Sequence, residues 1–320
     1  MKAIVCTKYG PPDVFQLKEV EKPTPKNNEA LVKVHAASFN ATDLEYLRGA
    51  RKQKNKILGS DIAGRVEAVG RNVKQFQPGD DVFGDLFACG FGAFAEYVAV
   101  PENVLTLKPA SMTFEEAATL PQAAILALQG LHGKRQIQHG QKVLINGAGG
   151  GVGTFAVQIA KYFGAEVTGV DSTGKLEMLC SIGADHVIDY TKEDFTKNGQ
   201  RYDLILDVVV HRSIFDYMRA LNPRGICVMV GGSMTRVFFN VLLGLLISMT
   251  GSKKIGVLMW KPNKQEDLVF IKELIEAGKV LPVIDRRYPL SEVPEAFRYL
   301  EEGHARGKVV ITVVGSNRNF

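Results

Sequence analysis

The feature that most constrains the fold of this chain is a run of small residues between a predicted strand and a predicted helix. Residues 142–146, KVLIN, have the continuous apolar character of a buried strand, and the loop GAGGGVG follows directly. A helix is predicted from about Gly150 to Phe163, and a second strand ends at Val170. The amides and the dipole of such a helix start attract the negative charge of a pyrophosphate. The predicted ligand is therefore a dinucleotide.

Two registers of the glycine loop fit the sequence. Counting back from Gly153 makes Ala148 the tight turn, Gly150 the point of close approach to the pyrophosphate, and Gly153 the contact between helix and strand. Counting from Gly147 places Val152 at the third glycine position, which is the poorer fit. The first register predicts that the cofactor-binding residues of the loop are Ala148, Gly150, Gly151, Val152 and Gly153. A tight turn that binds nothing is the alternative explanation.

The residues after the second strand bear on the choice between NAD(H) and NADP(H). Asp171 ends the strand, and an acid at this place accepts hydrogen bonds from a ribose 2′ hydroxyl and repels a 2′ phosphate, which favours NAD. Ser172, Thr173 and Lys175 follow, and they can bind a 2′ phosphate through hydrogen bonds and a point charge. The residues leave both cofactors open.

The rest of the chain divides into two kinds of sequence. At 320 residues it is long enough for two domains. The first 120 or so residues alternate short β-type runs with Gly and Pro, which predicts a mainly β domain. From Lys142 onward, continuous apolar strands alternate with helices, which predicts a doubly wound parallel α/β domain. A tail after Trp260 contains two further helices, 264–277 and 291–303, and two β-type segments, VLPVID and GKVVITVV.

Charge and hydropathy exclude several classes of protein. The net charge of +5 comes from 39 basic and 34 acidic residues without a run of five like charges, so no nucleic-acid partner is expected. The longest apolar stretch, 237–249, is shorter than the ~20 residues that span a bilayer, and no secretory signal is visible. No membrane association and a cytoplasmic location are expected. We interpret 238–247, FFNVLLGLLI, as a buried helix or a dimer contact.

Several segments together resemble a known family. The segments AIVCTKYGPPDVFQLKEVEKPTPKNNEALVKVHAASFNATD, ILGSDIAGRVEAVG, QPGDDVFG, FGAFAEYVAVP, the glycine loop, SIGADHVIDY and RGKVVITV lie in the order found in medium-chain dehydrogenase/reductases. They are similar to the zinc-independent quinone oxidoreductase branch in particular, over essentially the full chain. The resemblance implies a GroES-like, mainly β catalytic domain, 1–122 with 261–320, and a Rossmann domain, 123–260. It also implies a homodimer.

The resemblance further implies an enzyme that works without zinc. Zinc-dependent relatives have a cysteine at the position of Asn40 and a His-Glu pair at Ser60 and Asp61, and only Cys89 remains of their four-cysteine structural zinc site. The four cysteines of the chain, at 6, 89, 180 and 227, are far apart, so no metal site is predicted. Without a Lewis acid, an easily polarised acceptor is the more plausible substrate. The expected activity is NAD(P)H-dependent hydride transfer to quinones or α,β-unsaturated carbonyls.

Asn40 and Tyr46 are the candidate catalytic residues. Asn40 occupies the position of a metal ligand in relatives, and its amide can donate a hydrogen bond to the oxygen on which negative charge builds; the alternative is a cap for the helix 42–47. Tyr46 can donate a hydrogen bond or a proton to that oxygen, or it can pack under the domain.

Further cofactor contacts are expected at the carboxyl ends of later strands. Val209 ends the fourth strand of the α/β domain, and Gly231 and Gly232 end the fifth, where they can meet the nicotinamide. Gly307 and Lys308 resemble a pair that approaches the cofactor in the branch; a surface lysine at a strand edge is the alternative for Lys308.

A second function stays open beside the enzyme. Leu126 stands where relatives often have a residue with a hydroxyl group, and Val210 stands where a glycine is common. These departures suggest a catalytically weak protein of the same fold, which would bind the cofactor as a regulator or bind RNA.

Overall fold

The chain forms two compact units, each described here by itself. The structure is a computed structural model of residues 1–320 and describes 1–49, 56–133, 137–232, 234–250 and 252–313. Unit 1 comprises Met1–Ala123, Lys261–Glu276 and Pro282–Phe320, and unit 2 comprises Ala124–Trp260 and Ala277–Leu281. The domain boundaries expected from the sequence include 277–281 in the β domain. The segment lies with unit 2 because the Gln158 side chain donates to the Leu281 carbonyl over 2.9 Å and accepts from its amide over 2.8 Å.

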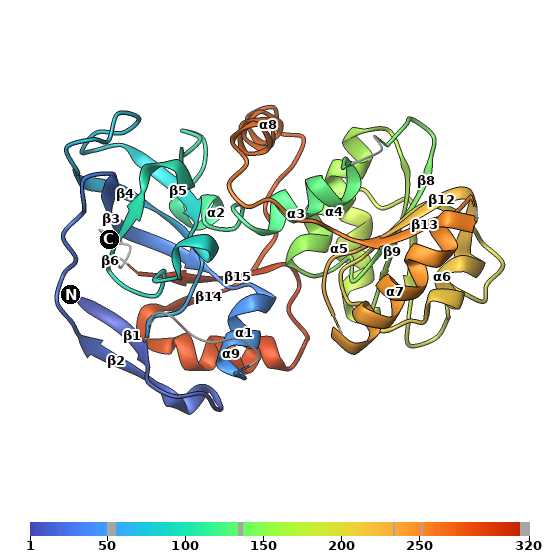
Figure 1. Cartoon of the computed structure of the whole chain (residues 1–320), viewed down its shortest axis with the longest axis horizontal. Coiled ribbons are helices and arrows are strands. Elements are labelled where there is room, and N and C mark those ends of the chain that lie inside the picture. The colour runs from blue at the N-terminus through green and yellow to red at the C-terminus, as the bar shows by residue number, and fades with distance from the viewer. Residues whose placement is uncertain (50–55, 134–136, 233, 251, 314–320) are drawn as a thin grey trace. The chain divides into compact units, whose positions relative to one another are not determined.

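Unit 1 is built on a seven-stranded sheet. Its path runs β14-β15-β3-β4-β5-β7, and β6 pairs with β3. In Figure 1 the red-brown β15 lies beside the blue β3, with which it pairs antiparallel. The tail therefore returns to the β sheet. The strands are β3 (Glu29–Ser38), β4 (Asp61–Val69), β5 (Asp81–Asp85), β6 (Tyr97–Pro101), β7 (Leu105–Leu107), β14 (Ile284–Pro289) and β15 (Lys308–Thr312), and a separate hairpin pairs β1 (Lys2–Cys6) with β2 (Phe15–Glu19).

Short helices complete unit 1. They are α1 (Ala41–Leu47), α2 (Phe114–Ala117), α8 (Gln265–Glu276) and α9 (Val293–Glu301), with the 3-10 turns η1 (Pro12–Val14), η2 (Phe87–Cys89), η3 (Glu102–Val104) and η5 (Leu290–Glu292). Phe297 of α9 is fully buried and meets Phe15, Phe39 and Phe94 in the core. Because α1 follows β3 after only two residues, the residues that join them are fixed by both elements.

Unit 2 is a six-stranded parallel sheet, which confirms the predicted doubly wound fold. The strand order is β10-β9-β8-β11-β12-β13. Numbered from its own first strand, this is the 3-2-1-4-5-6 order of dinucleotide-binding domains, in which ligands lie at the carboxyl ends of the strands. The strands are β8 (Lys142–Asn146), β9 (Glu166–Asp171), β10 (His186–Asp189), β11 (Tyr202–Asp207), β12 (Leu221–Met229) and β13 (Lys254–Val257).

Helix α3 (Ala123–Leu131) leads into the first strand of unit 2, and the helices that follow it connect parallel strands. These are α4 (Gly151–Tyr162), α5 (Leu176–Ser181), α6 (Ile214–Ala220) and α7 (Met234–Thr250), with the 3-10 turn η4 (Thr173–Lys175). The predicted helix 150–163 is α4, and its residues 153–160 are buried against the sheet. The side chain of Tyr217 on α6 is also fully buried, and its hydroxyl donates to Asp207 over 2.7 Å. This contact ties α6 to the end of β11.

Helix α7 is more exposed than one of the two interpretations of its sequence predicted. Phe238, Phe239 and Leu242 are more than half exposed, so the interpretation of this stretch as a buried helix is wrong for them. Asn240 on the same helix is buried, and its side chain donates to the Arg212 carbonyl over 3.0 Å. A polar residue therefore anchors the inner face, while large apolar residues cover the outer one. Across the described residues, no helix is long and apolar enough to cross a membrane.

Candidate functional site

A cluster of buried polar side chains lies where β3 passes into α1. Asn40 is the N-cap residue of α1, and the Asp43 carboxylate accepts from the Asn40 backbone amide over 2.9 Å. The Asn40 side chain is half-buried and donates from Nδ2 to Ser60 Oγ over 3.2 Å. Asn40 therefore caps the helix, as the sequence alternative proposed. Its side-chain amide also belongs to a polar network, which a capping role alone does not require.

Lys308 lies in this cluster, so the interpretation as a surface lysine is wrong. It is 2% exposed, and its Nζ atom donates to the Phe39 carbonyl over 2.7 Å and to Asn40 Oδ1 over 2.8 Å. The Asp61 carboxylate lies 3.4 Å away. Three acceptors match the three donors of an ammonium group. The neighbouring Gly307 has φ +100°, and a Cβ there would lie 2.3 Å from the Val283 carbonyl oxygen. The lack of a side chain at Gly307 therefore allows β15 to start beside Val283.

Burial governs the protonation of the cluster. It raises the pKa of Asp43 to about 7 and that of Asp85 well above its usual value, because the charged forms lose their hydration. Burial likewise raises the pKa of Asp61 and lowers that of Lys308, while their mutual attraction opposes both changes. The other oxygen of Asp61 has no hydrogen-bond partner among the described residues. Lys308 is thus the main compensation for the Asp61 charge.

Tyr46 lies on α1, one turn and a half after Asn40. Its ring meets the ring of Phe91 edge to face at a centroid distance of 4.5 Å, and it packs against the core of unit 1. This agrees with the packing role that the sequence left open. The side chain is half-buried rather than fully enclosed, so its hydroxyl stays a candidate donor.

The glycine loop joins β8 to α4, and Gly153 lies at a point of close contact, as the first predicted register expects. A Cβ on Gly153 would lie 2.3 Å from the Gly147 carbonyl oxygen and 2.5 Å from that of Ala148, so the helix approaches the loop too closely for a side chain. Gly150 is the N-cap residue of α4, and a Cβ there would meet the Gly147 carbonyl oxygen only at 3.6 Å, which is an ordinary contact distance. Ala148 is fully buried.

The start of α4 has the open donors that a pyrophosphate needs. The first intrahelical bond runs from the Thr154 amide to the Gly150 carbonyl. Helix geometry therefore leaves the amides of Gly151, Val152 and Gly153 without acceptors in their own helix. These amides, with the helix dipole, fit the diphosphate of a dinucleotide. The assignment of the loop residues to cofactor binding stays a prediction that this geometry supports.

Asp171 is turned toward the glycine loop. Its Oδ2 atom accepts from the Gly149 amide over 2.8 Å, and its Oδ1 atom accepts from the Ser172 amide over 2.9 Å and lies 3.3 Å from Lys175 Nζ. The side chains of Asp171 and Lys175 are 8% and 9% exposed. Asp171 and Lys175 therefore form a buried ion pair. Thr173, which is exposed, donates its hydroxyl to Asp189 at the end of β10.

Three further residues predicted to bind the cofactor lie just after the ends of β11 and β12. β11 ends at Asp207 and β12 at Met229, earlier than the sequence suggested, and the Val210 amide donates to the Gly231 carbonyl over 2.9 Å. Gly232 has φ +110°, and a Cβ there would lie 2.3 Å from the Val210 nitrogen, so only glycine fits. Val209 is 44% exposed and Val210 is fully buried. These residues follow the carboxyl ends of neighbouring strands, where a nicotinamide is expected.

Sequence reasoning missed two residues that adjoin the predicted ones. Tyr190 directly follows β10, is 56% exposed, and donates its amide to the Asp171 carbonyl over 3.1 Å. It therefore lies at the same sheet edge as Thr173. Asp61 was noted only as a missing zinc ligand, yet it is the buried partner of Lys308. Asp61 adjoins apolar residues that are expected to be buried, and burying an ionised group is costly. This could have indicated that Asp61 has a positively charged partner.

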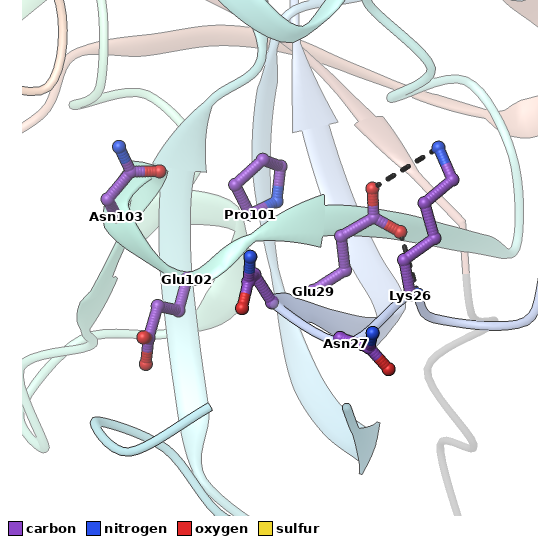
Figure 2. Close-up of a pocket in the computed structure, with 7 residues that line it drawn as sticks. Lys26, Asn27, Glu29, Pro101, Glu102 and Asn103 are labelled. Atoms are coloured by element: carbon purple, nitrogen blue, oxygen red, sulfur yellow. Dashed lines mark hydrogen bonds and ion pairs between the residues drawn. The ribbon is translucent and has the colours of Figure 1, made fainter. Parts of the chain in front are cut away.

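Two surface hollows lie away from these residues. Figure 2 shows one of about 570 Å³, lined by residues that include Lys26, Glu29 and Glu102. Glu29 begins β3 and Asn40 follows its end, so roughly 30 Å of strand separates them. Glu29 faces Lys26, and Glu102 accepts the amides of residues 74 and 75, so both acids serve local turns. The second hollow, about 510 Å³, lies at the amino end of β12, opposite the glycine loop.

Comparisons with known proteins agree with this geometry. Residues 26–110 match the alcohol dehydrogenase GroES-like domain, and residues 182–311 match the zinc-binding dehydrogenase domain. The chain is 38% identical to a 2-methylene-furan-3-one reductase of Solanum lycopersicum, over 97% of this chain and 79% of that protein. It is 34% identical to the chloroplastic NADPH-dependent alkenal/one oxidoreductase of Arabidopsis thaliana, with the same coverage.

The chain belongs to the quinone oxidoreductase branch of the medium-chain dehydrogenase/reductase superfamily.

Solved structures of this family have the same fold. The Coxiella burnetii quinone oxidoreductase matches with a TM-score of 0.89 and 30% identity, over 98% of this chain and 99% of that one. The Escherichia coli quinone oxidoreductase, solved with NADPH, matches with a TM-score of 0.88 and 26% identity, over 98% and 100%. The GroES-like and Rossmann folds expected from the sequence are confirmed.

Proposed function

We propose that this chain is an NADPH-dependent reductase of quinones and α,β-unsaturated carbonyl compounds. The observation that carries the proposal is the glycine loop, whose helix starts at Gly151 with open amides and admits no side chain at Gly153. The names of the relatives support it, since they include an alkenal/one oxidoreductase and quinone oxidoreductases. The amides of 151–153 would hold the diphosphate, and Val209, Gly231 and Gly232 would border the nicotinamide.

The chain's own polar residues would stabilise the charge that forms during reduction. The bound dinucleotide supplies a hydride, which adds to the β-carbon of an enone or to a quinone ring. The electron pair of the alkene would then form a double bond to the carbonyl carbon while the π pair of the carbonyl moves onto its oxygen, and a proton would complete the saturated carbonyl compound or the hydroquinone. Asn40 would donate a hydrogen bond to that oxygen. The Tyr46 hydroxyl is our candidate for the proton donor.

We further propose that NADPH is preferred over NADH. An acid that selects NAD needs its carboxylate free for the ribose hydroxyls. Both oxygens of Asp171 already accept backbone amides, and the adjacent ammonium of Lys175 compensates its charge. The exposed residues Thr173 and Tyr190 remain at this edge. A 2′ phosphate would therefore meet the exposed Tyr190 and a compensated acid rather than an open carboxylate.

Replacing Asp171 by Asn tests this preference. The Asn oxygen can accept only one of the two amides that Asp171 accepts, and Lys175 loses the compensating charge, so we expect kcat/KM to fall by a similar factor for both cofactors and the preference for NADPH to persist. If Asp171 instead bound the ribose of NADH, the loss of a hydrogen bond to a charged group, about 1.5–3 kcal/mol, would reduce kcat/KM for NADH alone by roughly tenfold or more. Steady-state kinetics with both cofactors separates the two results.

A substrate panel tests the activity. We expect loss of NADPH absorbance with quinones and with enones, and the same rates after dialysis against a chelator, because Asn40 and Ser60 stand where relatives have zinc ligands. Cofactor binding without turnover of any acceptor would contradict the enzyme and favour the regulatory alternative. Turnover that disappears with the chelator and returns with zinc would contradict the metal-free mechanism.

The homodimer and the cytoplasmic location stay predictions. The exposed apolar side chains Phe238, Phe239 and Leu242 of α7 support a contact with a second chain, since large exposed apolar patches are typical of interfaces. Relatives include proteins named mitochondrial and chloroplastic, so the location of this chain is not set by its family.

A further inference from the structure

The orientation of the Asn40 amide is set by three side-chain neighbours, Lys308, Ser60 and Asp61, whose carboxylate also accepts from the amide. Lys308 Nζ lies 2.8 Å from one end of the amide, and Ser60 Oγ lies 3.2 Å from the other. A hydroxyl group can donate or accept, so Ser60 pairs equally well with the oxygen or the nitrogen of an amide. An ammonium group only donates. Lys308 therefore decides that the Asn40 oxygen faces inward and that its nitrogen lies on the side of Ser60.

Lys308 is itself held in one position. Its ammonium group also donates to the Phe39 carbonyl over 2.7 Å, and the Asp61 carboxylate lies 3.4 Å away. Asp61 in turn accepts the Ser38 hydroxyl over 3.1 Å. Lys308 is 2% exposed and Asp61 is fully buried, so solvent does not compete for these contacts. The chain thus contains a buried cation whose donors are all directed at neighbouring atoms.

We propose that Lys308 is a positioning residue for reduction, which fixes the Asn40 amide so that it offers a donor and not an acceptor to the substrate oxygen. This rests on the proposed function, in which Asn40 donates to the oxygen that gains charge. An Nδ2 group has two hydrogens; Ser60 and Asp61 lie on the inner side of the amide and share one, and the proposal assigns the other to the substrate. Without Lys308 the amide can rotate by half a turn, and its oxygen would then repel the developing negative charge.

This role differs from a contact between Lys308 and the cofactor, which the sequence suggested. A cofactor contact would need an Nζ donor, whereas all three are directed at Phe39, Asn40 and Asp61. The two roles predict different kinetics. A positioning residue acts through Asn40, so its removal changes the rate of hydride transfer and leaves the affinity for NADPH unchanged.

A double-mutant cycle tests the proposal through single-turnover hydride transfer from NADPH to an enone. We expect Asn40→Ala to slow transfer by about 10²-fold, as for the loss of one oxyanion donor. Lys308→Met should slow it at least about tenfold, and the two changes together should be no slower than Asn40→Ala alone, within about 3-fold. The Kd for NADPH should stay within about 2-fold throughout. Lys26→Met, at an exposed lysine, is the matched control and should leave transfer unchanged.

The variants also separate folding from positioning. Lys308→Met leaves Asp61 buried without its cation, so the cycle is repeated with Asp61→Asn/Lys308→Met, which removes both charges. Multiplicative losses in the cycle, or an NADPH Kd raised tenfold with an unchanged transfer rate, would overturn the positioning role. A wild-type protein that binds NADPH but reduces no acceptor would instead overturn the proposed function, and that result is seen without any variant.

Discussion

Replacing Lys308 by Met should lower the free energy of unfolding of unit 1 by about 3–5 kcal/mol, because it leaves a buried carboxylate without its compensating charge. Asp61 is fully buried, and without Lys308 its remaining side-chain partners, Ser38 and Asn40, are both uncharged. Native-state hydrogen exchange of the amides of β3 and β15 measures the change, since both strands belong to unit 1.

Two further variants show whether the buried pair is the cause. Asp61→Asn/Lys308→Met removes both charges and should recover most of the stability. Arg65→Met breaks the exposed pair of Arg65 and Asp81, which lies across β4 and β5, and should cost less than about 1 kcal/mol. Equal losses for Lys308→Met and Arg65→Met would contradict the account of this pair.

Replacing Gly153 by Ala should raise the Kd for NADPH by about 100-fold and lower the stability of unit 2 by about 1–3 kcal/mol. The new Cβ would lie 2.3 Å from the Gly147 oxygen and 2.5 Å from the Ala148 oxygen, both of them backbone atoms. The helix start or the loop must therefore shift, and the amides that receive the diphosphate shift with it. Calorimetric titration with NADPH and urea unfolding measure the two effects.

Two other glycines provide controls for this variant. A Cβ on Gly150 meets only the Gly147 oxygen, at 3.6 Å, so Gly150→Ala should fold normally and lose NADPH affinity only because the backbone can no longer approach the pyrophosphate. A Cβ on Gly256 of β13 has no neighbour within 4 Å, so Gly256→Ala should change neither property. Normal binding by Gly153→Ala would contradict the predicted register of the loop.

The sequence predicted the glycine loop well because its causes are local. The strand 142–146, the loop and the helix are adjacent in the chain, and the close approach that requires Gly153 occurs between residues six apart. The parallel order of the sheet also followed from the apolar strands that alternate with helices. For the loop and for the sheet, the order of residue types along the chain was enough to predict the structure.

The β strands of the tail were harder to predict. The sequence analysis took VLPVID, 280–285, as the strand, whereas β14 comprises Ile284–Pro289. β14 pairs only with β15 and lies at the sheet edge, so it includes the exposed residues Arg286 and Arg287. Val280 is fully buried outside the strand. A run of apolar residues predicts that these residues are buried. In a strand at the edge of a sheet, the residues that are buried need not be the residues that pair with the next strand.

The role of Lys308 could not be read from the sequence because its partner is remote. Asp61 lies 247 residues earlier in the chain, and their contact depends on the pairing of β15 and β4 with the same strand, β3. The inward turn of Asp171 depends likewise on the Gly149 amide, 22 residues away. Residue types indicated that these positions matter, and only the folded geometry shows which atoms they contact.

The central claim is that a reduced pyridine nucleotide binds to the loop that ends at Gly153 and is then oxidised by an activated alkene or quinone. The most direct measurement is a calorimetric titration of the wild-type protein with NADPH, followed by addition of an enone to the saturated complex. The account predicts saturable binding of one NADPH per chain and its oxidation when the enone is added. No detectable binding of NADPH or NADH at millimolar concentration would contradict it.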